Sequence, residues 1–137
     1  KKELLIIPIF GWYLKKIGSI SIIRNKVSKD NLSFFGDILR HVNSSDRPLI
    51  IFPQGTRLSP EERTPFKKGS SRIYKELNIS CQPIAINSGY IWPKLGLKKS
   101  NKTLIISILK PIEPGLDKLT FLTKLQNDIY SELDNLN

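Results

Sequence analysis

The sequence predicts an α/β protein, built as a layered sheet of mostly buried strands flanked by helices. Two observations support this class. Short, wholly apolar runs alternate along the chain with amphipathic segments at helical spacing. The apolar runs contain almost no polar residues, as expected for strands that are covered on both faces. The 137 residues fit one domain, residues 1–137, with no linker rich in glycine or serine.

The expected strands and helices follow from these runs. Buried strands are expected at residues 49–52, 83–86 and 103–109, and a polar–apolar alternation predicts another at 19–22. Helices are expected at 11–14, 30–42 and 67–77, with Asp30 as a cap of the second. Asp117 is expected to cap a last helix, whose apolar stripe would be Leu119, Leu122, Leu125, Ile129, Leu133 and Leu136.

Composition limits the classes of partner. The net charge is +10, which favours polyanions: nucleic acid, anionic lipid headgroups or phosphorylated substrates. Cys81 is the only cysteine, so the sequence offers no internal disulfide and no cysteine-based metal site, and Cys81 is interpreted as a small core residue. No apolar stretch is long enough to span a bilayer, although residues 4–14 are apolar enough to lie on one.

The segment most suited to chemistry is the loop of residues 52–57, Phe52, Pro53, Gln54, Gly55, Thr56 and Arg57. It follows a predicted strand, where open α/β sheets place their ligands. Gly55 permits close approach of a ligand, Thr56 offers a hydroxyl, and Arg57 offers a planar fork of donors that matches phosphate oxygens. Arg24 ends the separate predicted strand, so it is a candidate second cation for the same anion. The alternative is a turn with solvated arginines.

The order of these segments resembles the phospholipid acyltransferase family, typified by 1-acyl-sn-glycerol-3-phosphate acyltransferase. Residues 18–24 resemble its second motif, whose Arg aligns with Arg24. Residues 52–57 resemble its Phe-Pro-Glu-Gly-Thr-Arg motif, followed by Phe-Lys-Lys-Gly at 66–69. Residues 82–89 resemble its fourth, apolar motif, which puts Pro83 and Ile84 near the acyl site.

The resemblance implies a reaction and its partners. An acyl group would pass from acyl-CoA or acyl-carrier protein to the free hydroxyl of 1-acyl-sn-glycerol 3-phosphate, giving phosphatidate in phospholipid biosynthesis. No cofactor and no metal are expected. The expected partners are the lysophosphatidate-like acceptor, the acyl donor and a membrane surface, with no nucleic acid. The implied location is the cytoplasmic face of the bacterial cytoplasmic membrane, peripheral or anchored through an N-terminal region.

Two departures qualify this function. Gln54 stands where the family has Glu, which removes a charge. The family's catalytic His-x-x-x-x-Asp motif is expected upstream, so the domain is interpreted as N-terminally incomplete and no catalytic residue is expected in this chain. His41 and Asp46 have the same spacing but follow Arg24, which is the wrong order.

The sequence is also compatible with two other functions. The first is a non-catalytic module that binds anionic lipid or a partner, as the remnant of a split acyltransferase gene. The second is a nucleic-acid binder, which the charge alone suggests and no motif supports.

Overall fold

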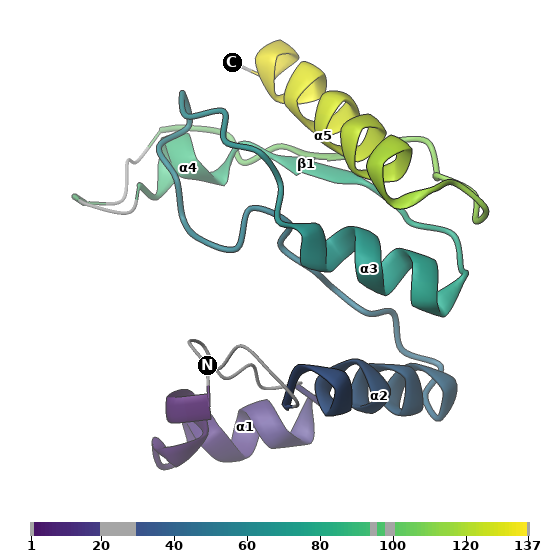
Figure 1. Cartoon of the computed structure of the whole chain (residues 1–137). Coiled ribbons are helices and arrows are strands. Elements are labelled where there is room, and N and C mark those ends of the chain that lie inside the picture. The colour runs from purple at the N-terminus through teal and green to yellow at the C-terminus, as the bar shows by residue number, and fades with distance from the viewer. Residues whose placement is uncertain (1, 20–29, 94–95, 98–100, 137) are drawn as a thin grey trace. The chain divides into compact units, whose positions relative to one another are not determined.

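The computed structural model describes residues 2–19, 30–93, 96–97 and 101–136 (Figure 1). The chain divides into two compact units, Lys1–Leu49 and Ile50–Asn137. Arg24 and residues 20–22 of the predicted strand at 19–22 lie outside the described residues.

The described residues of the first unit form helices. It contains a 3-10 helix η1 (Lys2–Ile6), helix α1 (Phe10–Lys16) and helix α2 (Asp30–Asn43). Gly11 lets η1 and α1 pack closely, because a Cβ at this position would lie 2.2 Å from the carbonyl oxygen of Leu5. In α2, Ile38 is buried while Leu39 and Val42 are half-buried, as the helical spacing of these three apolar residues predicts.

The second unit contains α3 (Lys68–Leu77), β1 (Ile84–Ile86), α4 (Ser88–Ile91), β2 (Ile106–Ile108) and α5 (Lys118–Asn135). Strands β1 and β2 form an antiparallel ribbon in which Ala85 pairs with Ser107. Helix α5 packs against both α3 and β1 (Figure 1). Ala85 is fully buried, and the hydroxyl of Ser107 donates to Glu132 Oε1 on α5 at 2.6 Å.

The predicted burial of the strands on both faces is wrong for the described residues. One face of the ribbon is covered by α5, and the isoleucines of the other face are exposed: Ile84, Ile86, Ile106 and Ile108. Residues 49–52 were predicted as a central strand, but they pair with no strand in the described part of the chain, and Phe52 is 77% exposed. The apolar composition of a strand does not show whether one or both of its faces are covered. The coarser α/β class is compatible with the helices and the two-stranded sheet.

The core of the second unit lies between α3, α5 and the ribbon. Its buried members are Phe66, Tyr74, Ile112, Phe121, Leu125 and Tyr130. The rings of Tyr74 and Phe121 stack with centroids 3.8 Å apart, and Phe66 meets Tyr130 edge to face at 5.1 Å. Cys81 packs against this cluster, and burial raises the pKa of its thiol. The interpretation of Cys81 as a small core residue is therefore confirmed.

Helix α5 begins at its predicted cap, and most of the predicted stripe packs on the core: Leu122, Ile129 and Leu133 are partly buried against it. Leu125 is buried as expected, whereas Leu119 is 74% exposed. Phe121 and Tyr130, which the leucine and isoleucine pattern left out, lie in the core as well. The covered face of α5 therefore combines most of the predicted stripe with two large aromatic side chains, which offer more apolar area than leucine.

The Asp117 cap gives α5 a pH-dependent start. Its side chain accepts hydrogen bonds from the backbone N–H groups of Leu119 at 2.9 Å and Thr120 at 3.1 Å. The Thr120 hydroxyl also donates to it, and these bonds hold the pKa of Asp117 below its ordinary value of 3.8. Because the pKa is lower in the folded protein, the charged cap stabilises the fold above that ordinary value. The stabilisation is lost as the pH falls through the folded-state pKa.

Asp117→Asn keeps a capping oxygen but does not titrate. We therefore expect this variant to lose less stability on acidification than the wild type. The free energy of unfolding would be measured by urea titration of both proteins at neutral pH and below pH 3.8. The difference in free energy of unfolding between the wild type and Asp117→Asn should be smaller at the lower pH. Parallel pH profiles would show that Asp117 contributes no titrating stabilisation.

Candidate functional site: the loop of residues 52–57

The predicted phosphate loop is a tight turn in the second unit. The backbone N–H of Gly55 donates to the carbonyl oxygen of Phe52 at 3.0 Å, which closes a four-residue turn. Pro53 and Gly55 occupy the second and fourth positions of this turn, where type I turns favour them. Gly55 has φ +71°, a left-handed conformation that glycine adopts at little cost.

The loop is attached to the start of helix α3. The backbone N–H of Lys67, the residue before α3, donates to the carbonyl oxygen of Pro53 at 2.8 Å. The side chain of Lys67 passes over Gly55, because a Cβ at Gly55 would lie 3.2 Å from Lys67 Cγ. The loop of residues 52–57 and the Phe-Lys-Lys-Gly segment at 66–69 therefore meet in space.

We expect Gly55→Ala to destabilise the protein by about 1 to 2 kcal/mol, because alanine is strained at this φ and its Cβ must displace Lys67. Gly69→Ala is the matched control. Gly69 lies inside α3 without a positive φ, and a Cβ added there would meet no atom within 4 Å, so alanine is expected to be neutral or stabilising. Urea unfolding of both variants tests this, and equal effects would show that the turn geometry does not matter.

The surroundings of the loop favour an anion. Thr56, Arg57, Lys67 and Lys68 are all exposed. Among the residues that the structure describes, no ion pair involves Arg57. Helix α3 has no side-chain cap and no acidic residue in its first turn, so no side chain there offsets the partial positive charge of the helix start. This combination suits phosphate oxygens.

The segment that follows the loop is attached to helix α5. Arg63 Nη2 donates to Asp134 Oδ1 at 2.6 Å, and this ion pair raises the pKa of Arg63. The Tyr130 hydroxyl donates to the carbonyl oxygen of Thr64 at 2.7 Å. The N–H of Phe66 donates to Gln126 Oε1 at 2.9 Å. Residues 63–66, which lead into α3, are thus bonded to α5 at three points. They hold the start of α3 in place, and the loop of residues 52–57 is bonded to that start through Lys67.

The other predicted site residues lie in different places. Arg24 lies outside the described residues, so its distance from Arg57 stays a prediction. Pro83 is fully buried next to β1, and its carbonyl oxygen accepts from the N–H of Leu109 at 3.1 Å, whereas Ile84 is 43% exposed. Asn87, in the same apolar motif, is buried and bonds residues 103 and 105: its Nδ2 donates to Thr103 O at 3.2 Å and its Oδ1 accepts from Ile105 N at 2.9 Å.

The pair His41 and Asp46 does not form a catalytic dyad in the structure. His41 lies in the last turn of α2, and its Nδ1 is 3.0 Å from the carbonyl oxygen of Asp37. Asp46 is an exposed residue of the following bend, and no hydrogen bond or ion pair between it and His41 is present in the described part of the first unit. The histidine is therefore oriented by a backbone carbonyl and not by a carboxylate.

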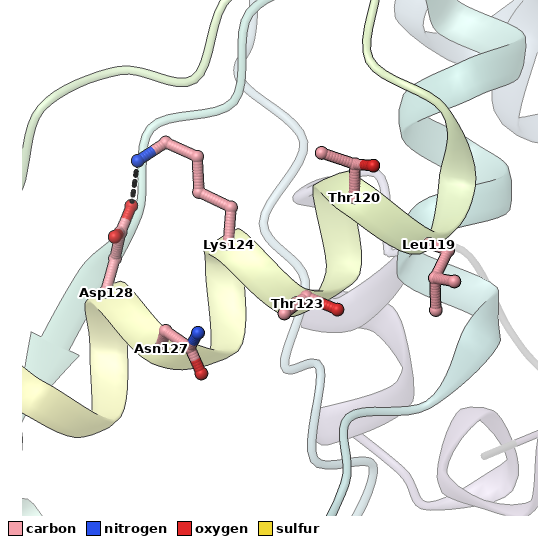
Figure 2. Close-up of a pocket in the computed structure, with 6 residues that line it drawn as sticks. All are labelled: Leu119, Thr120, Thr123, Lys124, Asn127 and Asp128. Carbon is pink, nitrogen blue, oxygen red and sulfur yellow. Dashed lines mark ion pairs between the residues drawn. The ribbon is translucent and has the colours of Figure 1, made fainter.

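A shallow surface depression lies elsewhere, and Figure 2 shows the six side chains around it: Leu119, Thr120, Thr123, Lys124, Asn127 and Asp128. All six come from α5, with Lys124 and Asp128 joined by an ion pair at 3.0 Å. It includes none of the predicted site residues. Over the described ranges, no helix has the length and apolar character needed to cross a bilayer, and no cluster of three His, Cys, Asp or Glu residues suits a metal ion.

Sequence reasoning missed the connections that hold the loop. Lys67 was singled out only as part of the Phe-Lys-Lys-Gly segment, but its backbone and side chain support the turn directly. Gln126, Tyr130 and Asp134 are 60 or more residues from the groups they bind. The sequence offered one hint: Gln126 lies in the predicted last helix, and a polar side chain that is buried there needs a hydrogen-bond partner.

Comparison with known proteins identifies the family. The acyltransferase family model matches residues 1–87, and the chain belongs to this family. It is 33% identical over 110 residues to a 1-acyl-sn-glycerol-3-phosphate acyltransferase of Pseudomonas aeruginosa, which covers 79% of this chain and 42% of that protein. It is 32% identical over 116 residues to the enzyme of that name from Saccharomyces cerevisiae, covering 82% of this chain and 38% of that protein.

A third relative of the same name, from Helicobacter pylori, is 31% identical over 134 residues, covering 96% of this chain and 56% of that protein. The chain thus spans about half the length of the curated relatives it matches. No solved structure matches the chain.

Proposed function

We propose that this chain contributes the phosphate-binding part of an acyl transfer to 1-acyl-sn-glycerol 3-phosphate, giving phosphatidate in phospholipid biosynthesis. The acceptor hydroxyl oxygen attacks the carbonyl carbon of an acyl thioester, from acyl-CoA or acyl-carrier protein. A C–O bond forms, the C–S bond breaks, and the thiol leaves with the proton. The acyl donor is a co-substrate, so the proposal includes no cofactor.

The proposal rests chiefly on one observation, the hydrogen bond from Lys67 N to Pro53 O. This bond ties the turn that leads into Thr56 and Arg57 to the residue before α3, whose start has no side-chain cap and is flanked by Lys67 and Lys68. A phosphate there would receive donors from backbone, hydroxyl and guanidinium groups together. We assign Arg24 to the same phosphate, and we assign Phe52, Pro53 and Gln54 to the support of the loop. Pro83 and Ile84 are assigned to the acyl side of the site.

The proposal assigns the general base to no residue of this chain. The hydroxyl needs a base with a suitable pKa to become a good nucleophile. His41 is the single histidine, and its ring is bound to the backbone of its own helix. We further propose that the reaction takes place at the cytoplasmic face of the bacterial cytoplasmic membrane, where the lipid acceptor is dissolved.

A binding and turnover experiment tests this function. The 137-residue chain is titrated with a short-chain 1-acyl-sn-glycerol 3-phosphate, and then incubated with that acceptor and an acyl thioester. We expect saturable binding, and we expect His41→Ala to leave any acyl transfer unchanged. Robust turnover that His41→Ala abolishes would overturn the assignment of the base.

The non-catalytic alternative predicts a different pattern. A module that only recognises anionic lipid would bind phosphatidylglycerol as tightly as the lysophosphatidate acceptor. Salt-sensitive binding to DNA without affinity for either lipid would instead contradict both lipid hypotheses.

A further inference from the structure

Helix α5 bonds the segment that leads into α3 through three side chains on one of its faces. Gln126, Tyr130 and Asp134 are spaced four residues apart, so they lie above one another on the helix. Their partners are residues 66, 64 and 63, in that order. Residues 63–66 therefore run antiparallel along α5, which lies outside the residues that match the acyltransferase family model. We call these three side chains the α5 row.

The α5 row and the segment beside it have similar lengths. From Gln126 to Asp134 the helix rises about 12 Å. Three extended steps along the backbone, from residue 66 back to residue 63, span about 10 Å. Residues 62–67 form neither helix nor strand, so their path depends on the bonds that they make to other elements. The α5 row therefore sets the path of this segment and the place where α3 begins.

The α5 row ends one residue away from the bond that holds the loop of residues 52–57. Phe66 is 4% exposed, and its N–H donates to Gln126 Oε1 at 2.9 Å. The next N–H along the chain, that of Lys67, donates to the carbonyl oxygen of Pro53 at 2.8 Å. Two consecutive N–H groups thus join α5 on one side and the turn on the other. Because a peptide unit is planar and stiff, a displacement of Phe66 also displaces the partner of Pro53.

We propose that Gln126, Tyr130 and Asp134 are positioning residues, which set the affinity of the loop of residues 52–57 for the phosphate of the acceptor. They act through residues 63–67 and not by touching the phosphate. A binding group must be held within about 0.5 Å of its productive position, so a small displacement of the turn weakens binding while the protein stays folded. The inference rests on the proposed function, because it concerns the same phosphate site.

Asp134→Asn separates positioning from charge, because the two effects have opposite signs. The substitution raises the net charge by one unit above +10, which by itself would strengthen the binding of an anion. It also breaks the ion pair with Arg63, and the positioning role then predicts an affinity for a short-chain 1-acyl-sn-glycerol 3-phosphate about twofold to threefold lower. The Asp134 side chain is 65% exposed, so the variant should fold. Unchanged or tighter binding in isothermal titration calorimetry would overturn the proposal.

Gln126→Leu tests the end of the α5 row that lies nearest the loop. It removes the acceptor of the Phe66 N–H without changing the charge, and leucine is as good a helix former as glutamine. We expect the affinity for the same acceptor to fall about fivefold and the Lys67 N–H to exchange faster with deuterium. Ser107→Ala is the matched control, because it removes a different bond to α5, the one to Glu132 at 2.6 Å. It should change the affinity less than about twofold, and equal losses in the two variants would contradict the positioning role.

The Arg57→Ala background separates this inference from the proposed function. If the α5 row acts by placing Arg57, Gln126→Leu should cost clearly less affinity once Arg57 has been removed. An Arg57→Ala variant that binds as tightly as the wild type would contradict the phosphate site itself. A clear loss from Arg57→Ala with none from Gln126→Leu would overturn the positioning role alone. If Gln126→Leu does not fold, the affinity of Asp134→Asn decides between the two roles.

Discussion

Replacement of Phe121 by alanine is expected to lower the free energy of unfolding by about 3 to 5 kcal/mol. Phe121 is 1% exposed, and its ring stacks on Tyr74 at 3.8 Å between α5 and α3. The truncation removes that contact and leaves a cavity in the middle of the core cluster. Because small domains are stable by only about 5 to 15 kcal/mol, this loss is a large part of the total.

Leu119→Ala is the matched control for Phe121. It lies on the same helix, two residues before Phe121, and was predicted from spacing to be part of the apolar stripe. Since its side chain is 74% exposed, we expect a change of no more than about 0.5 kcal/mol. Urea unfolding followed by circular dichroism measures both variants. A larger loss for Leu119→Ala than for Phe121→Ala would contradict the described packing of α5.

Replacement of Arg57 by alanine is expected to weaken binding of a short-chain 1-acyl-sn-glycerol 3-phosphate about 30-fold. The estimate corresponds to the loss of charge-assisted hydrogen bonds worth about 2 kcal/mol. The affinity of Arg57→Lys should lie between those of the wild type and Arg57→Ala, because lysine keeps the charge but loses the fork that matches two phosphate oxygens. Isothermal titration calorimetry with the full chain measures the three affinities.

Lys110→Ala controls for the general loss of positive charge. Lys110 is exposed beyond the end of β2, and its removal should change the affinity less than about twofold. If Arg57→Ala and Lys110→Ala weaken binding equally, the positive charge of the whole protein attracts the ligand and the loop has no specific role.

The local elements of the fold were predictable from sequence because they depend on nearby residues. Asp117 caps α5 as expected, and α3 begins one residue after its predicted start. The burial of the strands was not predictable, because Ile84 and Ile86 have the same composition whether a second layer covers them or not. Phe121 was missed for a related reason, since spacing alone does not say which of several apolar residues turns inward.

The candidate site was predictable in its residues but not in its support. The sequence of residues 52–57 and its similarity to a family motif singled out Gly55, Thr56 and Arg57. The attachment of this loop to Lys67 depends on a backbone hydrogen bond, which every residue but proline can make. The bond from Phe66 to Gln126 joins residues 60 positions apart, and such pairs leave no local pattern in one sequence.

A double-mutant cycle on Arg24 and Arg57 tests most directly whether two distant arginines hold one phosphate. The affinity for the short-chain acceptor is measured for the wild type, Arg24→Ala, Arg57→Ala and the double variant. Groups that share a ligand show a coupling energy of about 0.5 to 3 kcal/mol, so we expect the second substitution to cost clearly less once the first is made. Losses that add to within about 0.5 kcal/mol, or no loss at all from Arg24→Ala, would contradict the shared anion site.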